Sequence, residues 1–207
     1  MLKQSKAVFA AAGIGVIACA VALAQGAKDA DKLSKYEIDK PVAAEFKLRD
    51  VTHDLKATEK PDAAMVALSS FKDKKPVVLF FMSERCGTTW KYEKRLGQLM
   101  KKNSKDVAFM GVRCSANDSA ESIRKFCETR NFEMPVLNDE KGDLSKFFKV
   151  TNTPTFTLID NKGVVRYRGS FDDSAEESGV MKTYLADAVK AVLDSKEVAI
   201  KTTRPFG

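Results

Sequence analysis

The sequence predicts an α/β domain in which helices flank a central mixed β-sheet. Two continuous apolar segments, residues 76–82 and 107–114, are typical of strands buried on both faces, as in the parallel part of such a sheet. A helical pattern follows each segment, at residues 87–103 and 119–132. Because crossovers between parallel strands are right-handed, helices are expected on both faces, and the parallel strands end at a common edge.

Two smaller elements are predicted before the first buried strand. Residues 44–55 alternate apolar and polar side chains around Phe46 and Leu48, which indicates an edge strand or a hairpin. Residues 61–71 predict a short helix that begins at Pro61, because proline is favoured in the first turn of a helix.

The second half of the chain predicts a short strand, a short helix, a β-hairpin and a closing helix. These elements span residues 135–137, 143–148, 155–169 and 176–194. The hairpin turns at residues 161–163, where Gly163 suits a tight turn.

The N-terminus resembles a secretory signal peptide. Two lysines precede an apolar run at residues 7–24, which ends in Ala22-Leu23-Ala24, the small residues that a signal peptidase recognises. An uncleaved membrane anchor is an alternative, and Val16-Ile17-Ala18-Cys19 resembles a lipobox in which Cys19 would be lipidated. We therefore expect an exported protein, periplasmic or otherwise extracytoplasmic and possibly membrane-anchored. The predicted organisation is a signal peptide (1–24), a spacer (25–43), one domain (44–195) and a tail (196–207).

Composition argues against several classes of function. The formal net charge of +7 comes from lysines that alternate with acids, without the basic stripe of a nucleic-acid-binding protein. His53 is the only histidine, so the sequence predicts neither a metal site nor a cofactor. Contact with a membrane is expected only through an N-terminal lipid or an uncleaved signal peptide.

Cys86 stands where the first buried strand meets a helix, in Cys86-Gly87-Thr88-Thr89. Unpaired backbone N–H groups and the helix dipole at such a position favour the thiolate and lower the pKa of the thiol. Arg85 can add positive charge, and the Thr89 hydroxyl can donate a hydrogen bond to the sulfur. The alternative is a small buried residue without chemistry.

The other cysteines of the exported chain are Cys114 and Cys127, an odd total of three that excludes a disulfide framework. Cys114 ends the second buried strand, so a disulfide with Cys86 is possible after a small loop movement. An inert packed thiol is the alternative. Cys127 lies on the apolar face of a predicted helix and is expected to be structural.

A second landmark is Pro154, which must begin its strand or lie on an edge because proline cannot donate to a ladder. The segments KKPVVLFFMSERCGTT and TNTPTFTLIDNKGVVRYRG together resemble the thioredoxin superfamily, in its exported redoxin or AhpC/TSA-like branch, over residues 44–195. This resemblance implies a thioredoxin-like fold. It also implies a cis peptide bond at Thr153-Pro154 that packs against Cys86, and a Thr153 backbone that hydrogen-bonds an extended substrate.

The chain also departs from the patterns of that superfamily. Thr89 stands where thioredoxins have the second cysteine of Cys-x-x-Cys, which brings the motif closer to monothiol glutaredoxins. Peroxiredoxins have Thr-x-x-Cys, and an arginine in the place of Pro154.

These observations predict a thiol-dependent oxidoreductase. Cys86 would attack a disulfide or a peroxide, and an external thiol or Cys114 would resolve the product. The expected partners are protein or low-molecular-weight thiols and disulfides. A non-catalytic module that binds a peptide near Thr153-Pro154 and a divergent peroxidase are the two alternatives.

Overall fold

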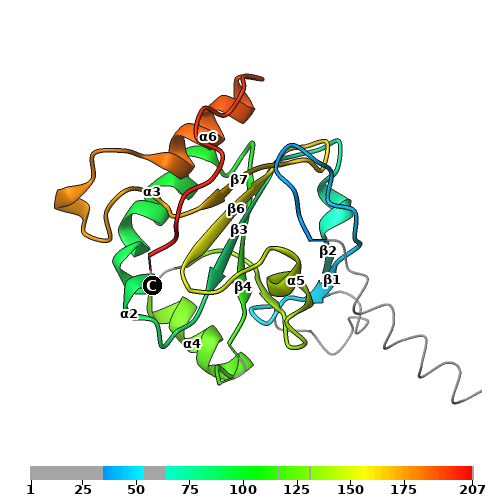
Figure 1. The fold of residues 1–207 in the computed structure, drawn as a ribbon. Helices are drawn as coiled ribbons and strands as arrows, with labels where there is room; N and C mark the ends of the chain where they lie inside the picture. The colour runs from blue at the N-terminus through cyan, green and yellow to red at the C-terminus, as the bar shows by residue number, and fades with distance from the viewer. Residues whose placement is uncertain (1–34, 54–63, 116, 131, 207) are drawn as a thin grey trace, which may run out of the picture. The chain divides into compact units, whose positions relative to one another are not determined.

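A computed structural model describes residues 35–53, 64–115, 117–130 and 132–206. Its centre is a five-stranded sheet in the order β5-β4-β3-β6-β7 (Figure 1). The strands are β3 (Val77–Met82), β4 (Ala108–Arg113), β5 (Val136–Asn138), β6 (Thr155–Ile159) and β7 (Val165–Gly169).

The sheet is mixed, as the sequence predicts. Strand β3 pairs in parallel with β4 and antiparallel with β6, while β4–β5 is parallel and β6–β7 is antiparallel. All six residues of β3 are buried, in agreement with the continuous apolar segment that predicts it. The register places Met82 beside Arg113, so β3 and β4 end at the same edge.

Two apolar clusters cover opposite faces of the sheet. The helices are α2 (Gly87–Lys91), α3 (Glu93–Asn103), α4 (Ala120–Thr129), α5 (Asp143–Phe147) and α6 (Tyr184–Leu193). Alternate residues of β3, among them Phe80, pack with residues of α3, α4 and α6. The intervening residues of β3, among them Phe81, pack with residues of α5.

The predicted helix at residues 61–71 is wrong in its described part. Residues Met65–Ala67 form strand β2, which pairs antiparallel with β1 (Lys47–Arg49), and a 3-10 turn follows at Leu68–Phe71. Backbone hydrogen bonds to the β1 region flank this pairing, from Asp50 N to Ala64 O and from Leu68 N to Phe46 O. Pairing with a distant segment therefore overrides the local preference. The edge strand predicted in residues 44–55 is confirmed.

Two predicted helices have different limits in the structure. The helix at 87–103 divides at Tyr92, whose ring is buried against Phe156 and Phe171. The closing helix starts at Tyr184 rather than at residue 176. The segment before it contains a 3-10 turn at Glu177–Gly179, and Asp173 accepts hydrogen bonds from the backbone of residues 181 and 182, which holds a loop in place of the helix.

The segments on either side of the predicted domain contact it. Asp39 N donates to Val165 O and Val42 N to Gly163 O, so part of the predicted spacer lies along the hairpin. In the predicted tail, Thr202 forms a β-bridge with Arg168. The predicted signal peptide and lipobox lie outside the described residues. Within the described ranges, no helix is both long enough and apolar enough to cross a membrane.

Candidate active site

Cys86 is placed by the end of the central strand. After β3 the chain turns, with Cys86 N donating to Ser83 O at 3.2 Å, and Cys86 then forms the N-cap of α2 with an extended backbone conformation. Thr89 N donates to Cys86 O at 3.0 Å, which closes the first turn. The half-buried thiol therefore lies at the edge of the sheet where β3 and β4 end.

Thr153 lies directly against the Cys86 sulfur. The thiol donates a hydrogen bond to Thr153 O, with 2.9 Å between Sγ and the oxygen. The Thr153–Pro154 peptide bond is cis, which confirms what the family resemblance implies. Residues far apart in the chain meet here because β6 pairs with β3, with Thr155 beside Phe81.

The surroundings of Cys86 lower the pKa of its thiol. Burial acts in the opposite direction and is the largest single influence. It is outweighed by the hydrogen bonds that a thiolate would accept, from the side chain of Thr153, the backbone and side chain of Thr89 and the backbone of Thr88. The bond to the Thr153 carbonyl belongs to the thiol form, because a carbonyl only accepts. When Cys86 loses its proton, the hydrogen bond that its thiol gives to one acceptor is therefore replaced by hydrogen bonds that its thiolate accepts from several donors.

The Thr89 hydroxyl is built into this arrangement. Its Oγ1 is buried and has no hydrogen-bond partner among the described residues while the thiol keeps its proton. A buried polar group without a partner costs about 1–3 kcal/mol. A thiolate at Cys86 would supply the missing acceptor, which supports the predicted role of Thr89 as a donor to the sulfur.

Arg85, predicted to add positive charge at the sulfur, is engaged elsewhere. Its side chain is 68% exposed, and its Nε lies 3.7 Å from Oδ1 of the buried Asp118. Its Nη2 donates to Asn117 O at 3.3 Å. The structure thus directs this guanidinium towards the loop that precedes α4.

Cys114 follows β4 beside the end of β3, as predicted, but its thiol is not activated. Burial, with Asp139 and Asp118 nearby, raises its pKa to about 12. Its Sγ donates to Met82 O at 3.4 Å, and it packs against the apolar cluster of α5. Its role as a resolving thiol stays a prediction. Cys127 is buried in the opposite cluster, where burial raises its pKa to about 12.

A cleft of about 750 Å³ opens beside Cys86. It is lined by Cys86, residues 151–153, Arg168 and residues 203–205. The sequence analysis misses Arg168 and the tail residues, because the tail shows no periodicity. The β-bridge between Thr202 of the tail and Arg168 joins positions more than thirty residues apart.

A model described as the AhpC/TSA family matches residues 42–168 of this sequence. The chain belongs to this family. Together with the mixed sheet, the cis peptide bond and the cysteine after β3, this establishes a thioredoxin-like fold. It also supports thiol–disulfide or peroxide chemistry in general.

Individual relatives agree with this membership. The chain is 28% identical over 113 residues to the thioredoxin-like protein YneN of Bacillus subtilis, a match that covers 51% of this chain and 66% of the relative. An uncharacterized conserved protein from Geobacillus kaustophilus is 25% identical, with a TM-score of 0.68 over 81% of this chain and 88% of that one. A secreted disulfide oxidoreductase of Mycobacterium tuberculosis, described as homologous to DsbE of E. coli, is 20% identical, with a TM-score of 0.53 over 70% and 95%. At this identity the last likeness concerns the fold alone.

Proposed function

We propose that this protein is an exported thiol-dependent oxidoreductase whose nucleophile is Cys86. The observation that carries the proposal is the set of donors around the Cys86 sulfur, which favours the thiolate at the mouth of a cleft. A thiolate, rather than a thiol, is the nucleophile in disulfide exchange. Export rests on the signal-like pattern of residues 1–24.

The proposed reaction has two exchange steps. The Cys86 thiolate attacks one sulfur of a disulfide, forming a mixed disulfide, and the other sulfur leaves as a thiolate that takes a proton from solvent. The thiolate of an external thiol then attacks the substrate sulfur of the mixed disulfide. This second step joins the substrate to the external thiol and releases Cys86 as a thiolate again. The backbone of Thr153, beside the sulfur, is the proposed contact for an extended substrate.

An external thiol suits the second step better than Cys114 does. The raised pKa of Cys114 keeps it protonated at neutral pH, and its packing against the α5 cluster would have to break before a disulfide formed. Resolution by Cys114 therefore requires a rearrangement that resolution by a free thiol does not.

The family membership also favours a second candidate, a peroxidase. In that reaction the Cys86 thiolate attacks one peroxide oxygen, the O–O bond breaks, the other oxygen leaves as hydroxide or alkoxide, and Cys86 becomes a sulfenic acid. One thiol then condenses with the sulfenic acid to give a disulfide and water, and a second thiol attacks this disulfide and releases Cys86 as a thiolate. Against this stand the order of the motif, with Cys86 before Thr89, and Pro154 in the place of the peroxiredoxin arginine.

Turnover by the purified protein tests the proposal. We expect glutathione-dependent exchange with 2-hydroxyethyl disulfide, loss of at least about 100-fold in Cys86→Ser, and little change in Cys114→Ser, since only Cys86 supplies an activated thiolate. Faster consumption of hydrogen peroxide than of the disulfide would favour the peroxidase. Turnover of neither substrate would favour a non-catalytic binding module.

A further inference from the structure

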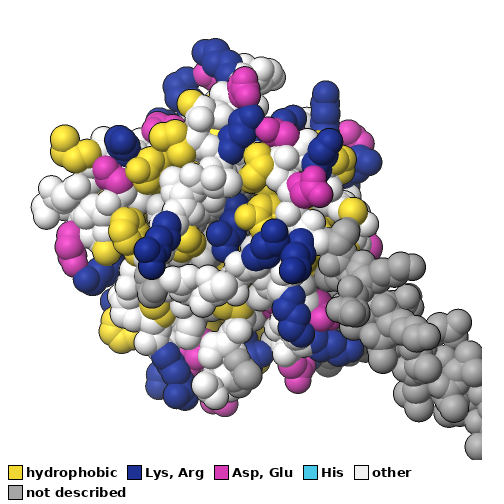
Figure 2. All heavy atoms as spheres, viewed as in Figure 1, with side chains coloured by type: hydrophobic (Ala, Val, Ile, Leu, Met, Phe, Trp, Pro, Cys, Tyr) yellow, Lys and Arg dark blue, Asp and Glu magenta, His cyan; other side chains and the backbone are white. Residues whose placement is uncertain are grey.

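The charges that line the Cys86 cleft have no ionic partner among the described residues. Its lining contains two cations, Arg168 and Arg204, and no acid. Neither arginine forms an ion pair with any residue that the structure describes. Several other arginines do lie within ion-pair distance of a carboxylate, namely Arg85, Arg95, Arg130 and Arg166. On the face of the molecule drawn in Figure 2, dark-blue Lys and Arg side chains lie across the middle, between the C-terminal segment and α5 of Figure 1.

Backbone carbonyls fix Arg168 in the cleft without neutralising it. Its Nε donates to Phe148 O at 3.0 Å, and its Nη2 donates to Lys149 O at 2.7 Å. Both acceptors follow α5 and carry no formal charge. The guanidinium therefore keeps its full positive charge in a defined orientation.

The tail carries Arg204 to the same cleft. Thr203 Oγ1 lies 2.7 Å from Tyr167 Oη and accepts from Ser170 N at 2.9 Å, and Pro205 is buried. Arg204 is exposed between these two anchored residues. The backbone of the tail is thus held at the cleft, while the charged side chain stays open to solvent.

An unpaired guanidinium near a reacting sulfur favours anionic partners, because it pairs well with carboxylates and raises the local concentration of anions. We propose that the substrate of Cys86 is a low-molecular-weight disulfide that carries carboxylates, held by Arg168 and Arg204. The cleft has the size of a small-molecule site. This assignment of a substrate class rests on the proposed oxidoreductase function.

Two alkylating agents of nearly equal size isolate the effect of charge. Iodoacetate is an anion and iodoacetamide is neutral, and both transfer their carbon to the Cys86 thiolate with loss of iodide. The measurement is the ratio of their rates in the protein with Cys19→Ala, Cys114→Ala and Cys127→Ala, relative to the same ratio for 2-mercaptoethanol. We expect a relative ratio roughly threefold to tenfold above one, since a single partly screened charge contributes about 1 kcal/mol.

Arg204→Gln should lower the relative ratio, and Arg204→Glu should lower it further. Lys190→Gln is the matched control, because it removes one positive charge from the exposed face of α6 and should leave the ratio unchanged. In turnover with dithiothreitol as the reductant, oxidised glutathione should be reduced faster than the neutral 2-hydroxyethyl disulfide, and the cationic cystamine should be slowest. Preference for a long acidic disulfide peptide over oxidised glutathione would overturn the small-molecule assignment.

The outcomes separate the two proposals. One outcome is fast reaction with iodoacetamide, together with a relative ratio of one that does not change in Arg204→Gln. This outcome would remain consistent with the oxidoreductase and would refute the anionic substrate. For the case in which Cys86 is slow with both agents, binding of S-methylglutathione to Cys86→Ser is followed by NMR. Binding that weakens in Arg204→Gln would then support the anion site without the enzyme, and absence of binding would refute the site as well.

Discussion

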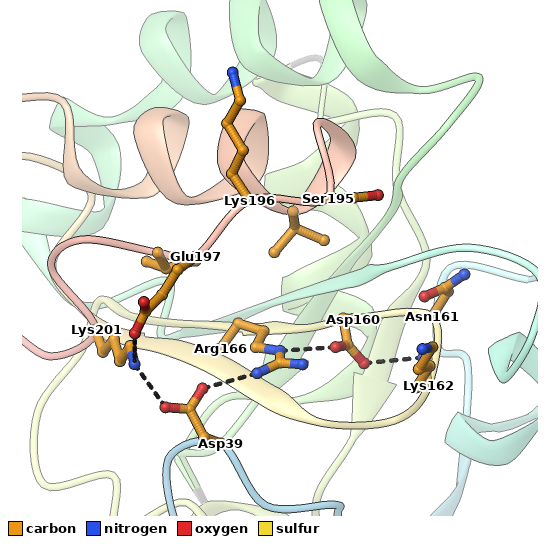
Figure 3. A pocket seen from close by; sticks show the side chains of 11 residues that line it. Asp39, Asp160, Asn161, Lys162, Arg166, Ser195, Lys196, Glu197 and Lys201 are labelled. Carbon is orange, nitrogen blue, oxygen red and sulfur yellow. Dashed lines mark hydrogen bonds and ion pairs between the residues drawn. The ribbon is translucent and has the colours of Figure 1, made fainter.

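Arg166 and Arg168 lie two residues apart on β7, and each lines a different hollow of the molecule. Arg168 lines the Cys86 cleft, of about 750 Å³. Arg166 lines a second hollow of about 390 Å³, formed by the hairpin turn, Asp39 and residues 195–201 (Figure 3). The second hollow is richer in charge, yet five of its charged side chains are joined to one another.

The pairs in this second hollow form a continuous chain. Arg166 donates to Asp160 at 2.7 Å and to Asp39 at 2.9 Å. Lys201 donates to Asp39 and to Glu197, both at 2.7 Å. Figure 3 shows this chain, with Lys196 pointing away from it. The pairs connect three segments that are distant in the sequence, so these charged side chains stabilise the fold.

The comparison teaches that the number of charged side chains does not identify a ligand site. What distinguishes the Cys86 cleft is cationic charge that no acid among the described residues neutralises. Where Arg166 is held by carboxylates, Arg168 is held by carbonyls. Only the second arrangement leaves an electrostatic field for a ligand to use.

The largest expected effect on this contrast comes from Gly169→Ala. A Cβ at Gly169 would overlap Thr203 Oγ1 and lie 2.8 Å from Thr203 N. It would therefore displace the tail segment that carries Arg204 and lines the cleft. We expect the free energy of unfolding to fall by about 1–3 kcal/mol, as for other overpacked sites. The relative iodoacetate ratio should fall towards one.

Urea unfolding and the alkylation ratio measure these two effects. Gly97→Ala is the control, because a Cβ at this exposed position of α3 meets nothing within 4 Å. It should stabilise the helix by about 0.5–1 kcal/mol. An unchanged ratio in Gly169→Ala would mean that the tail does not shape the cleft.

Thr89→Val should act on the nucleophile and leave the charges of the cleft in place. Valine keeps the shape of the side chain but cannot donate to the sulfur, so the pKa of Cys86 should rise. Alkylation by iodoacetamide at neutral pH should slow by up to about tenfold. The pH dependence of this rate gives the pKa directly. Thr89→Ser keeps the hydroxyl, so its Cys86 pKa should stay close to that of the unmodified protein. Equal Cys86 pKa values in all three proteins would show that the Thr89 hydroxyl does not act on the sulfur.

The smallest effect is expected from Asp39→Asn in the second hollow. The hydrogen bond from Lys201 is the largest influence on Asp39, and with Arg166 it lowers the pKa of this carboxyl. Because the pair is partly exposed, its loss should cost only about 0.5–1 kcal/mol. A lowered pKa in the folded protein means that this stability is present above the unfolded pKa and disappears as the pH falls through the folded pKa.

The difference in stability between Asp39→Asn and the unmodified protein should therefore shrink below about pH 4, where the carboxyl takes up a proton. Urea unfolding at neutral and acidic pH measures it. The alkylation ratio of Cys86 should not move at either pH. A change in that ratio would show that the two hollows are coupled, against the comparison drawn above.

Local signals predict most of the central sheet. The apolar run of β3, the hairpin around Gly163 and the Cys86 and Pro154 motifs all depend on residues close together in the chain. The short helix at residues 61–71 fails because pairing with β1 is decided by a distant segment.

The same reason explains what is missing from the predicted site. Cys86 and Thr153 are found because their motifs are local and specific. Arg204 reaches the cleft only through Thr203, whose hydroxyl contacts Tyr167, 36 positions away. No periodicity in the tail signals that contact, so the second arginine of the cleft could not be assigned from the sequence.

If Cys86 captures a substrate as proposed, the donors that stabilise its thiolate also determine how long that substrate stays attached. A sulfur that carries negative charge easily is a good leaving group, and exchange is faster when the departing thiol has a lower pKa. The mixed disulfide at Cys86 is therefore expected to be short-lived, and the same donors make the oxidised protein a stronger oxidant by stabilising its reduced form. The hydroxyl of Thr89 thus bears on the lifetime of the covalent complex as well as on its formation.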